Sequence, residues 1–138
     1  MDKPNPAEEH SPDIDLSSER ARSALAKMVI KLFGLWGLST ADQLELLGLS
    51  PESESMLAKY ANGEPLPLTP DMLDRVGWLM SIHKSLRILF PCNEHLCYLW
   101  VTRRNRAFDN RTALDIMKEQ GVVGFAQVAR YLHFYRER

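Results

Sequence analysis

Apolar residues recur at steps of three and four along this chain, and this spacing constrains the fold more than any other feature. Between residues 19 and 36 one apolar stripe is formed by Leu25, Met28, Val29, Leu32, Phe33 and Trp36. Such steps place side chains on one face of an α-helix. No long stretch alternates apolar and polar residues, as a half-buried strand requires. The sequence therefore predicts an all-α fold.

Start and stop signals divide this pattern into a series of helices. A start is a side chain that caps the first turn or a Pro in that turn, and a stop is Gly, Asn-Gly or Pro. The expected starts are Ser17 or Ser18, Thr40 with Gln43 as a capping box, Ser50-Pro51, Thr69-Pro70, Asn93, Thr112 and the residue after Gly121. The expected ends are Gly37, Gly48, Asn62-Gly63, Pro91, Trp100 and Met117. The segment "RRNRAFDNR" (103–111) is expected to be irregular, with a turn at Asp109-Asn110.

Charge is divided unevenly along the chain. Residues 1–19 hold six acids against one Lys, a net of -5, whereas residues 92–138 hold eight bases against five acids, a net of +3. The Pro-rich start has little to bury, so we expect residues 1–16 to form a flexible acidic tail. The tail either competes with DNA for basic surface or serves only solubility.

Several classes of protein are disfavoured. The longest apolar runs are far shorter than the roughly 18 residues of a membrane span, and no charged-then-apolar leader is present, so we expect a cytoplasmic protein. Cys92, His95 and Cys97, with the distant His83, could bind a metal ion, but the sequence lacks a second CxxC or HxxxH pair. A buried cysteine that acts as a small hydrophobic residue is the better interpretation. No GxSxG, HExxH or phosphate-binding Gly loop occurs, so we expect no enzyme, metal or cofactor.

The stretch "LELLGLSPESESMLAKYANG" (44–63) has the layout of a helix-turn-helix: an apolar helix end, a Gly turn and a second helix. The DNA-binding residues expected on the second helix are Ser53, Ser55, Lys59 and Tyr60. Glu52 and Glu54 stand where a cation would contact phosphate, and each acid opposes DNA binding. Glu also accepts from cytosine and suits a helix N-terminus, so a DNA-binding helix and a weakened copy of one both remain open.

Aromatic residues and arginines are interleaved from Trp100 to Arg111. Such a segment can stack and clamp single-stranded nucleic acid, or its aromatics can be core with solvated arginines around them. Arg and aromatic residues together are also the usual anchors of protein interfaces, which favours a protein partner.

Two stretches carry a resemblance to a known family. "RVGWLMSIHKSLRILFPCNEHLCYLW", followed by "NRAFDNRTALDIMKEQGVVGFAQVARYLHF", resembles the toxin-binding domain of the Xre/MbcA/ParS antitoxins, partners of RES-domain toxins. The resemblance extends over roughly residues 25–135, and its most specific elements are residues 82–91, 105–108, 111–115 and 130–132. Asp109-Asn110 replace the Gly-Gly that is usual in the loop, and Glu52 and Glu54 replace arginines of the recognition helix.

The resemblance implies an antitoxin that binds and blocks a toxin degrading nicotinamide adenine dinucleotide, and that often represses its own operon as a homodimer. It implies an Xre-like helix-turn-helix domain at residues 17–68 and a helical toxin-binding domain at residues 69–138. The expected partners are the cognate toxin and operator DNA, with no membrane. The alternative is a stand-alone DNA-binding transcriptional regulator.

The toxin-binding residues that we expect lie in the 103–111 segment and in the C-terminal "VARYLHFYRER". They are Arg104, Arg106, Phe108, Arg111, Arg130, Tyr131, Tyr135, Arg136 and Arg138. A projecting chain end can enter a partner's cleft without disturbing its own core. The competing interpretation is that Tyr131 and Phe134 close the local core while the arginines stay in water.

Overall fold

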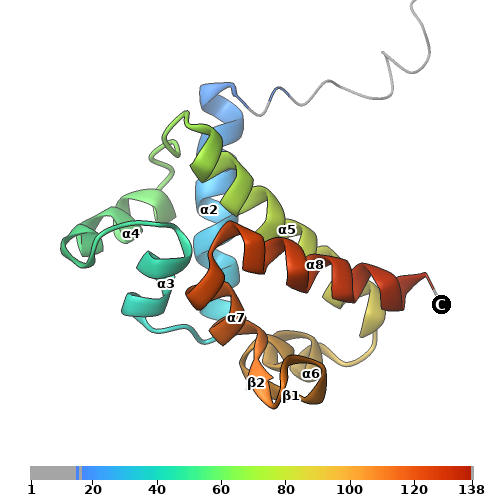
Figure 1. Ribbon diagram of the computed structural model, residues 1–138. Coiled ribbons are helices and arrows are strands. Elements are labelled where there is room, and N and C mark those ends of the chain that lie inside the picture. The colour runs from blue at the N-terminus through green and yellow to red at the C-terminus, as the bar shows by residue number, and fades with distance from the viewer. Residues whose placement is uncertain (1–14, 16, 138) are drawn as a thin grey trace, which may run out of the picture.

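The computed structural model describes residue 15 and residues 17–137, and its described elements are helices joined by turns and linkers, apart from one small hairpin (Figure 1). The elements are α2 (Glu19–Leu35), α3 (Thr40–Leu46), η1 (Pro51–Ser53), α4 (Glu54–Ala61), α5 (Pro70–Leu89), α6 (Glu94–Leu99), η2 (Trp100–Thr102), β1 (Arg104–Asn105), η3 (Arg106–Phe108), β2 (Arg111–Thr112), α7 (Ala113–Gln120) and α8 (Val122–Arg136). The all-α prediction is confirmed. The expected acidic tail lies outside the described residues, except for Asp15. No helix among the described residues is long and apolar enough to cross a membrane.

Local capping explains where most helices begin. The Thr69 hydroxyl accepts a hydrogen bond from the Met72 N–H at 3.2 Å, ahead of α5. At α7, Thr112 and Asp115 form a reciprocal capping box. The expected cap at Thr40 is wrong by one residue, because the Ser39 hydroxyl accepts from the Asp42 N–H and Thr40 already lies in α3.

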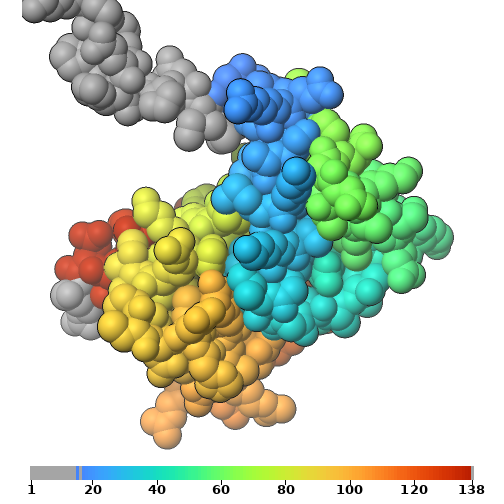
Figure 2. Space-filling view, turned by 180° about the vertical axis from the view of Figure 1, so that it is seen from behind, coloured from blue at the N-terminus to red at the C-terminus, as the bar shows by residue number. Residues whose placement is uncertain are grey.

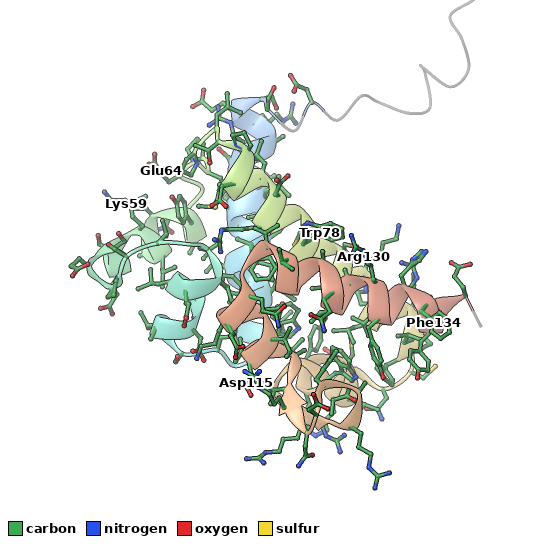
Figure 3. All side chains as sticks on the ribbon, in the orientation of Figure 1. Lys59, Glu64, Trp78, Asp115, Arg130 and Phe134 are labelled. Atoms are coloured by element: carbon green, nitrogen blue, oxygen red, sulfur yellow. The ribbon has the colours of Figure 1, made fainter. Side chains whose placement is uncertain are left out.

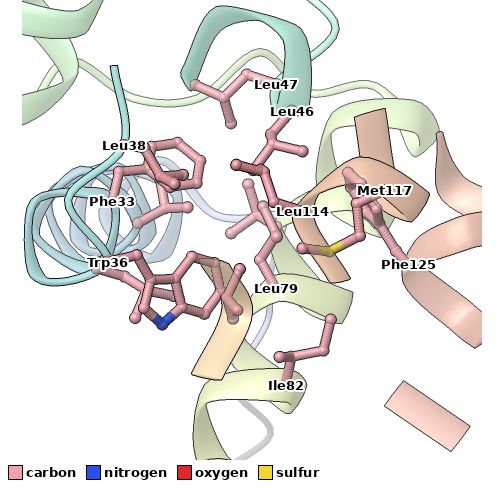
Figure 4. Close-up of a cluster of buried hydrophobic side chains, with 14 of the residues drawn as sticks. Phe33, Trp36, Leu38, Leu46, Leu47, Leu79, Ile82, Leu114, Met117 and Phe125 are labelled. Carbon is pink, nitrogen blue, oxygen red and sulfur yellow. The ribbon is translucent and has the colours of Figure 1, made fainter. Parts of the chain in front are cut away.

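Helix α5 is the centre of the molecule. Helix α8 packs along it, and α2 packs on it and also against α4 (Figure 1). Helix α7 precedes α8 and contacts both α8 and α3. One hydrophobic core therefore lies between the helix-turn-helix region and the C-terminal helices. Side chains from all the α-helices from α2 to α8 and from the adjoining turns meet in it. Figure 4 shows part of this core, with Phe33, Trp36, Leu38, Leu46, Leu47, Leu79, Ile82, Leu114, Met117 and Phe125 labelled.

Polar contacts also join the two regions. Arg75 of α5 donates to the Leu46 carbonyl at the end of α3 at 3.1 Å, and its guanidinium lies 5.8 Å from the centre of the Phe125 ring of α8. Lys118 of α7 pairs with Asp42 of α3 at 2.7 Å. The boundary that we expected at residues 68 and 69 stays a prediction, and it separates parts of the chain that share a core.

The 103–111 segment is more regular than the sequence indicated. Arg104 pairs with Thr112 and Asn105 with Arg111 in a short antiparallel hairpin. The predicted turn is confirmed, because Asp109 and Asn110 both adopt left-handed conformations, with φ of 56° and 66°. Two-residue strands are too short to leave an alternating pattern, so the hairpin was missed.

Candidate functional site

The helix-turn-helix consists of α3, a turn at Gly48, and α4 preceded by the short η1. Gly48 has a φ of +70°, and a Cβ atom at this residue would lie 2.9 Å from the Arg75 guanidinium carbon. The positive φ of this turn therefore favours glycine, and the end of the Arg75 side chain of α5 packs closely against it.

The four residues expected to bind DNA are not equivalent. Ser55 and Lys59 are exposed and lie one turn apart on α4, and Figure 3 labels Lys59. Ser53 is half-buried, lies in η1, and its hydroxyl is 3.1 Å from that of Ser50. Tyr60 is only 1% exposed and belongs to the core, and burial together with nearby Glu64 raises the pKa of its hydroxyl. Tyr60 therefore supports α4 from inside and is not part of an outward surface.

The N-terminal end of α4 is acidic and partly apolar. Glu52 and Glu54 are both exposed. A groove of about 610 Å³ lies beside them, with Leu44, Leu49 and Pro51 among its apolar lining and Glu54 at its edge. Glu52 and Glu54 repel the phosphates of DNA. The residue of α4 that can attract phosphate is Lys59, in the last turn of the helix.

A second candidate surface is built on a group of aromatic rings that joins the hairpin to the end of α8. The Tyr131 ring lies 6.2 Å from Trp100, 5.1 Å from Phe108 and 4.9 Å from Tyr135, measured between ring centres. Burial raises the pKa of the Tyr131 hydroxyl, and its hydrogen bond with Tyr135 raises it further. The rings therefore hold the hairpin against α8.

The structure separates the expected toxin-binding residues into three groups. Arg104, Arg106, Arg130 and Tyr135 are exposed. Arg111 pairs with Glu119, and Arg136 donates to the buried Ser85 hydroxyl at 3.2 Å.

The remaining members of the set have other positions. Phe108 is 5% exposed, so its ring fixes the hairpin and is not itself a contact surface. Tyr131 is half-buried among the rings. Arg138 lies outside the described residues.

Other residues of the C-terminal region acquire clear roles only in the structure. Val123 is 71% exposed, and Phe134, labelled in Figure 3, is exposed eleven residues further on, which at 100° per residue places it on the same side of α8. Gln127 and Arg130 are exposed between them, so the four residues follow one another at steps of four, three and four and form one exposed stripe along α8. The sequence spacing alone could have indicated this stripe.

The residues considered for metal binding do not gather. Cys92 is exposed and Cys97 is buried, and no group of three or more potential ligands occurs among the described residues. His83 Nε2 lies 3.4 Å from the Tyr98 hydroxyl, and burial lowers the pKa of His83, with Arg87 adding to the effect.

The fold and these surfaces define a helix-turn-helix protein joined to a small helical binding domain. The model of the Xre-like antitoxin helix-turn-helix domain matches residues 15–81. The model of the C-terminal toxin-binding domain of the Xre/MbcA/ParS antitoxins matches residues 85–137, so the two matches meet inside α5. The chain belongs to the Xre/MbcA/ParS antitoxin family. The description of the C-terminal family names toxin binding, and that of the N-terminal family names a helix-turn-helix.

One relative extends over nearly the whole chain. The uncharacterized protein y4oB of Sinorhizobium fredii is 36% identical over 121 residues, which is 87% of this chain and 91% of the relative. No solved structure matches the chain.

Proposed function

We propose that this chain neutralises a RES-domain toxin that degrades nicotinamide adenine dinucleotide, and that it represses its own operon as a homodimer through the helix-turn-helix. The observation that carries the toxin part of the proposal is the end of α8. Leu132 is the last buried residue of this helix, and the turn beyond it presents Tyr135 at 44% exposure. This turn lies within the part of the chain that matches the toxin-binding family model.

The chemistry of this helix end suits a dinucleotide-binding cleft. Such a cleft holds ribose hydroxyls with acidic groups, and an arginine of the antitoxin can pair with these groups. Tyr135 adds a large ring with few rotatable bonds, which is typical of an interface anchor. Arg136 is already oriented by its hydrogen bond to Ser85, so it loses little freedom on binding.

The test is truncation after Leu132 during co-expression with a RES-domain toxin from the neighbouring reading frame. We expect the truncated chain to stay helical by circular dichroism, because the residues removed contribute no buried hydrophobic side chain. We expect it to lose toxin binding in size-exclusion chromatography and to leave cells unprotected, because an interface anchor can contribute about 2 kcal/mol or more.

Two controls make this test specific. Ser85→Ala removes the hydroxyl that Arg136 meets while keeping the helix end, so it reports the cost of that hydrogen bond alone. Val123→Ala trims an exposed apolar side chain at the other end of α8. If the folded, truncated chain neutralises the toxin as well as the full chain does, the blocking surface is elsewhere, and the exposed Arg104 and Arg106 of the hairpin become the next variants.

The DNA part of the proposal rests on the exposed side of α4. Lys59→Ala should weaken binding to every duplex and reduce its salt dependence, whereas Ser55→Ala should change sequence preference. Unchanged binding in both variants would remove α4 from the interface. Specific operator binding without any neighbouring toxin gene would instead favour a stand-alone regulator.

A further inference from the structure

Three exposed cations form a line along the outer side of α2. Arg20, Lys27 and Lys31 are seven and four residues apart, so at 100° per residue all three fall within a narrow arc of the helix. At 1.5 Å per residue the line is about 16 Å long. Its only acidic neighbour on α2 is Glu19, in the first turn. We name Arg20, Lys27 and Lys31 the α2 cation line.

What sets these cations apart is their alignment on one helix, because within the described residues Lys59, Lys84 and Arg87 also have no carboxylate partner. In the described part of the chain, Arg75, Arg111 and Lys118 are each held by an ion pair, whereas no member of the α2 cation line lies within 4.0 Å of a carboxylate oxygen. Their charge is therefore not neutralised by the fold and is available to a polyanion.

The α2 cation line adjoins the helix-turn-helix at the C-terminal end of α4, where Lys59 is exposed and Glu64 follows the helix. Helix α2 packs against α4, and the two segments lie beside each other on the face shown in Figure 2. A Cβ atom on Gly63, just after α4, would lie 2.9 Å from the Lys27 Cε, so the Lys27 stem rests on the backbone there. Lys59 is exposed in the last turn of the same helix, whereas Glu52 and Glu54 are at the opposite end.

We propose that the α2 cation line contacts the phosphate backbone of duplex DNA bound at the helix-turn-helix. This inference rests on the proposed operator binding and assigns the phosphate contacts that the acidic start of α4 does not supply. Duplex DNA carries one negative charge per roughly 1.7 Å of its axis, and phosphate contacts provide most non-specific affinity. A straight helix that carries three unpaired cations matches a continuous row of charge.

Duplex DNA is favoured over two other occupants of this face. The acidic segment before α2 has the right charge, and if it occupied this face it would compete with DNA, which deletion of residues 1–16 tests. A second copy of the chain could cover the neighbouring apolar Met28 and Leu35, which are 48% and 40% exposed. That contact would bring the cations of the two copies close together, and like charges repel each other. Acidic residues between them could relieve the repulsion, but α2 carries no acidic residue beyond its first turn.

The experiment uses the full chain with Lys27→Ala/Lys31→Ala and measures binding to a fluorescent duplex from upstream of the gene and to a scrambled duplex. Anisotropy titrations between about 50 and 200 mM salt give the slope of log affinity against log salt. Losing two phosphate contacts should reduce that slope by about 1.8, at 0.9 per contact, and by the same amount for both duplexes.

Two matched variants isolate the cause. Lys84→Ala/Arg87→Ala removes two exposed cations of α5 and should leave the slope unchanged. Lys27→Arg/Lys31→Arg keeps both charges and should keep the slope. Circular dichroism and light scattering of each variant report folding and oligomeric mass.

An unchanged slope for Lys27→Ala/Lys31→Ala, or an equal loss from the α5 pair, would overturn the α2 contact while leaving operator binding by the antitoxin in place. If the full chain binds neither duplex, both this inference and the proposed repression fail, although toxin neutralisation is measured separately. A change of oligomeric mass in the α2 variant without a change of slope would assign this face to contact between copies and would also overturn the inference.

Discussion

Gly124 and Gly34 offer the same substitution with opposite expected signs. Both lie in end turns of helices, Gly124 in the first turn of α8 and Gly34 in the last turn of α2, and neither has a positive φ. In a helix interior, Ala is more favourable than Gly by about 1 kcal/mol, which is the upper limit for these end turns. A Cβ atom at Gly34 would have no neighbour within 4 Å, so nothing opposes this gain.

At Gly124 the packing of α7 on α8 opposes it. A Cβ atom there would lie 2.5 Å from the Ile116 carbonyl oxygen and 3.0 Å from the Gln120 Cβ. The first neighbour is backbone, so the two helices must separate. Overpacking of this kind costs about 1–3 kcal/mol, and a backbone contact as short as 2.5 Å belongs to the upper part of that range, about 2–3 kcal/mol. After a helical gain of about 1 kcal/mol, we expect Gly124→Ala to lose about 1–2 kcal/mol of the free energy of unfolding.

Thermal unfolding followed by circular dichroism measures both variants. An unfolding entropy of about 2.1 cal/mol/K per residue converts 1 kcal/mol into about 3–4 °C for a chain of this length. Gly34→Ala should therefore raise Tm by up to about 4 °C, and Gly124→Ala should lower it by about 3–8 °C. A Gly124→Ala protein that melts at or above the wild-type temperature would refute the close contact between α7 and α8.

Three further predictions test other contacts. Arg75→Ala should lower the free energy of unfolding in urea by about 1.5–3 kcal/mol, because the Arg75 guanidinium, on a side chain that is 17% exposed, satisfies a carbonyl of α3. Asp71→Ala removes only the ion pair one turn away and should cost under about 0.5 kcal/mol. Equal losses in the two variants would contradict the stabilising role of the Arg75 hydrogen bond to α3. The hydrogen bond from the Thr112 backbone N–H lowers the pKa of the Asp115 carboxyl in the folded state. The stabilisation by Asp115 is therefore complete above the pKa of the unfolded chain and is lost as pH falls through the pKa of the folded state. Tm should fall less between pH 5 and 3 in Asp115→Asn than in the wild type, and parallel curves of Tm against pH would contradict this contribution of Asp115. If the acidic residues 1–16 compete with DNA for basic surface, deleting them should tighten DNA binding at low salt. The effect should fade at physiological salt, where charges are screened over about 8 Å. No change at low salt would favour a segment that makes no such contact.

The helices could be predicted from sequence because their determinants are local. Apolar spacing and caps at Thr69, Asn93 and Thr112 act within a few residues, and the structure confirms these three starts. The error at α3 has the same local origin. Ser39 and Thr40 can both cap a helix, and the backbone conformation, which the sequence does not contain, selects Ser39.

The surfaces could be predicted only in part because burial is decided by distant segments. Tyr60 and Phe108 belong to residue types common in interfaces, yet other helices cover them, and both became core. Arg136 finds the Ser85 hydroxyl across 51 positions of sequence, a pairing that no local pattern indicates. The α2 cation line was overlooked for a different reason, since its residues are local but their lack of partners is known only once the fold is known.

The helix-turn-helix and the toxin-binding region do not carry their surfaces on independent cores. The buried side chains of α2, α3, α5, α7 and α8 form one cluster, and Arg75 and Lys118 tie α3 to α5 and α7. A partner that binds only the folded state stabilises every part of a cooperative unit. A toxin held at the end of α8 therefore also protects α4 and the α2 cation line from unfolding, although it touches neither. Conversely, a substitution that opens the shared core, such as one at Leu79, weakens both proposed activities at once, whereas Lys59 or Tyr135 can be changed with loss of only one.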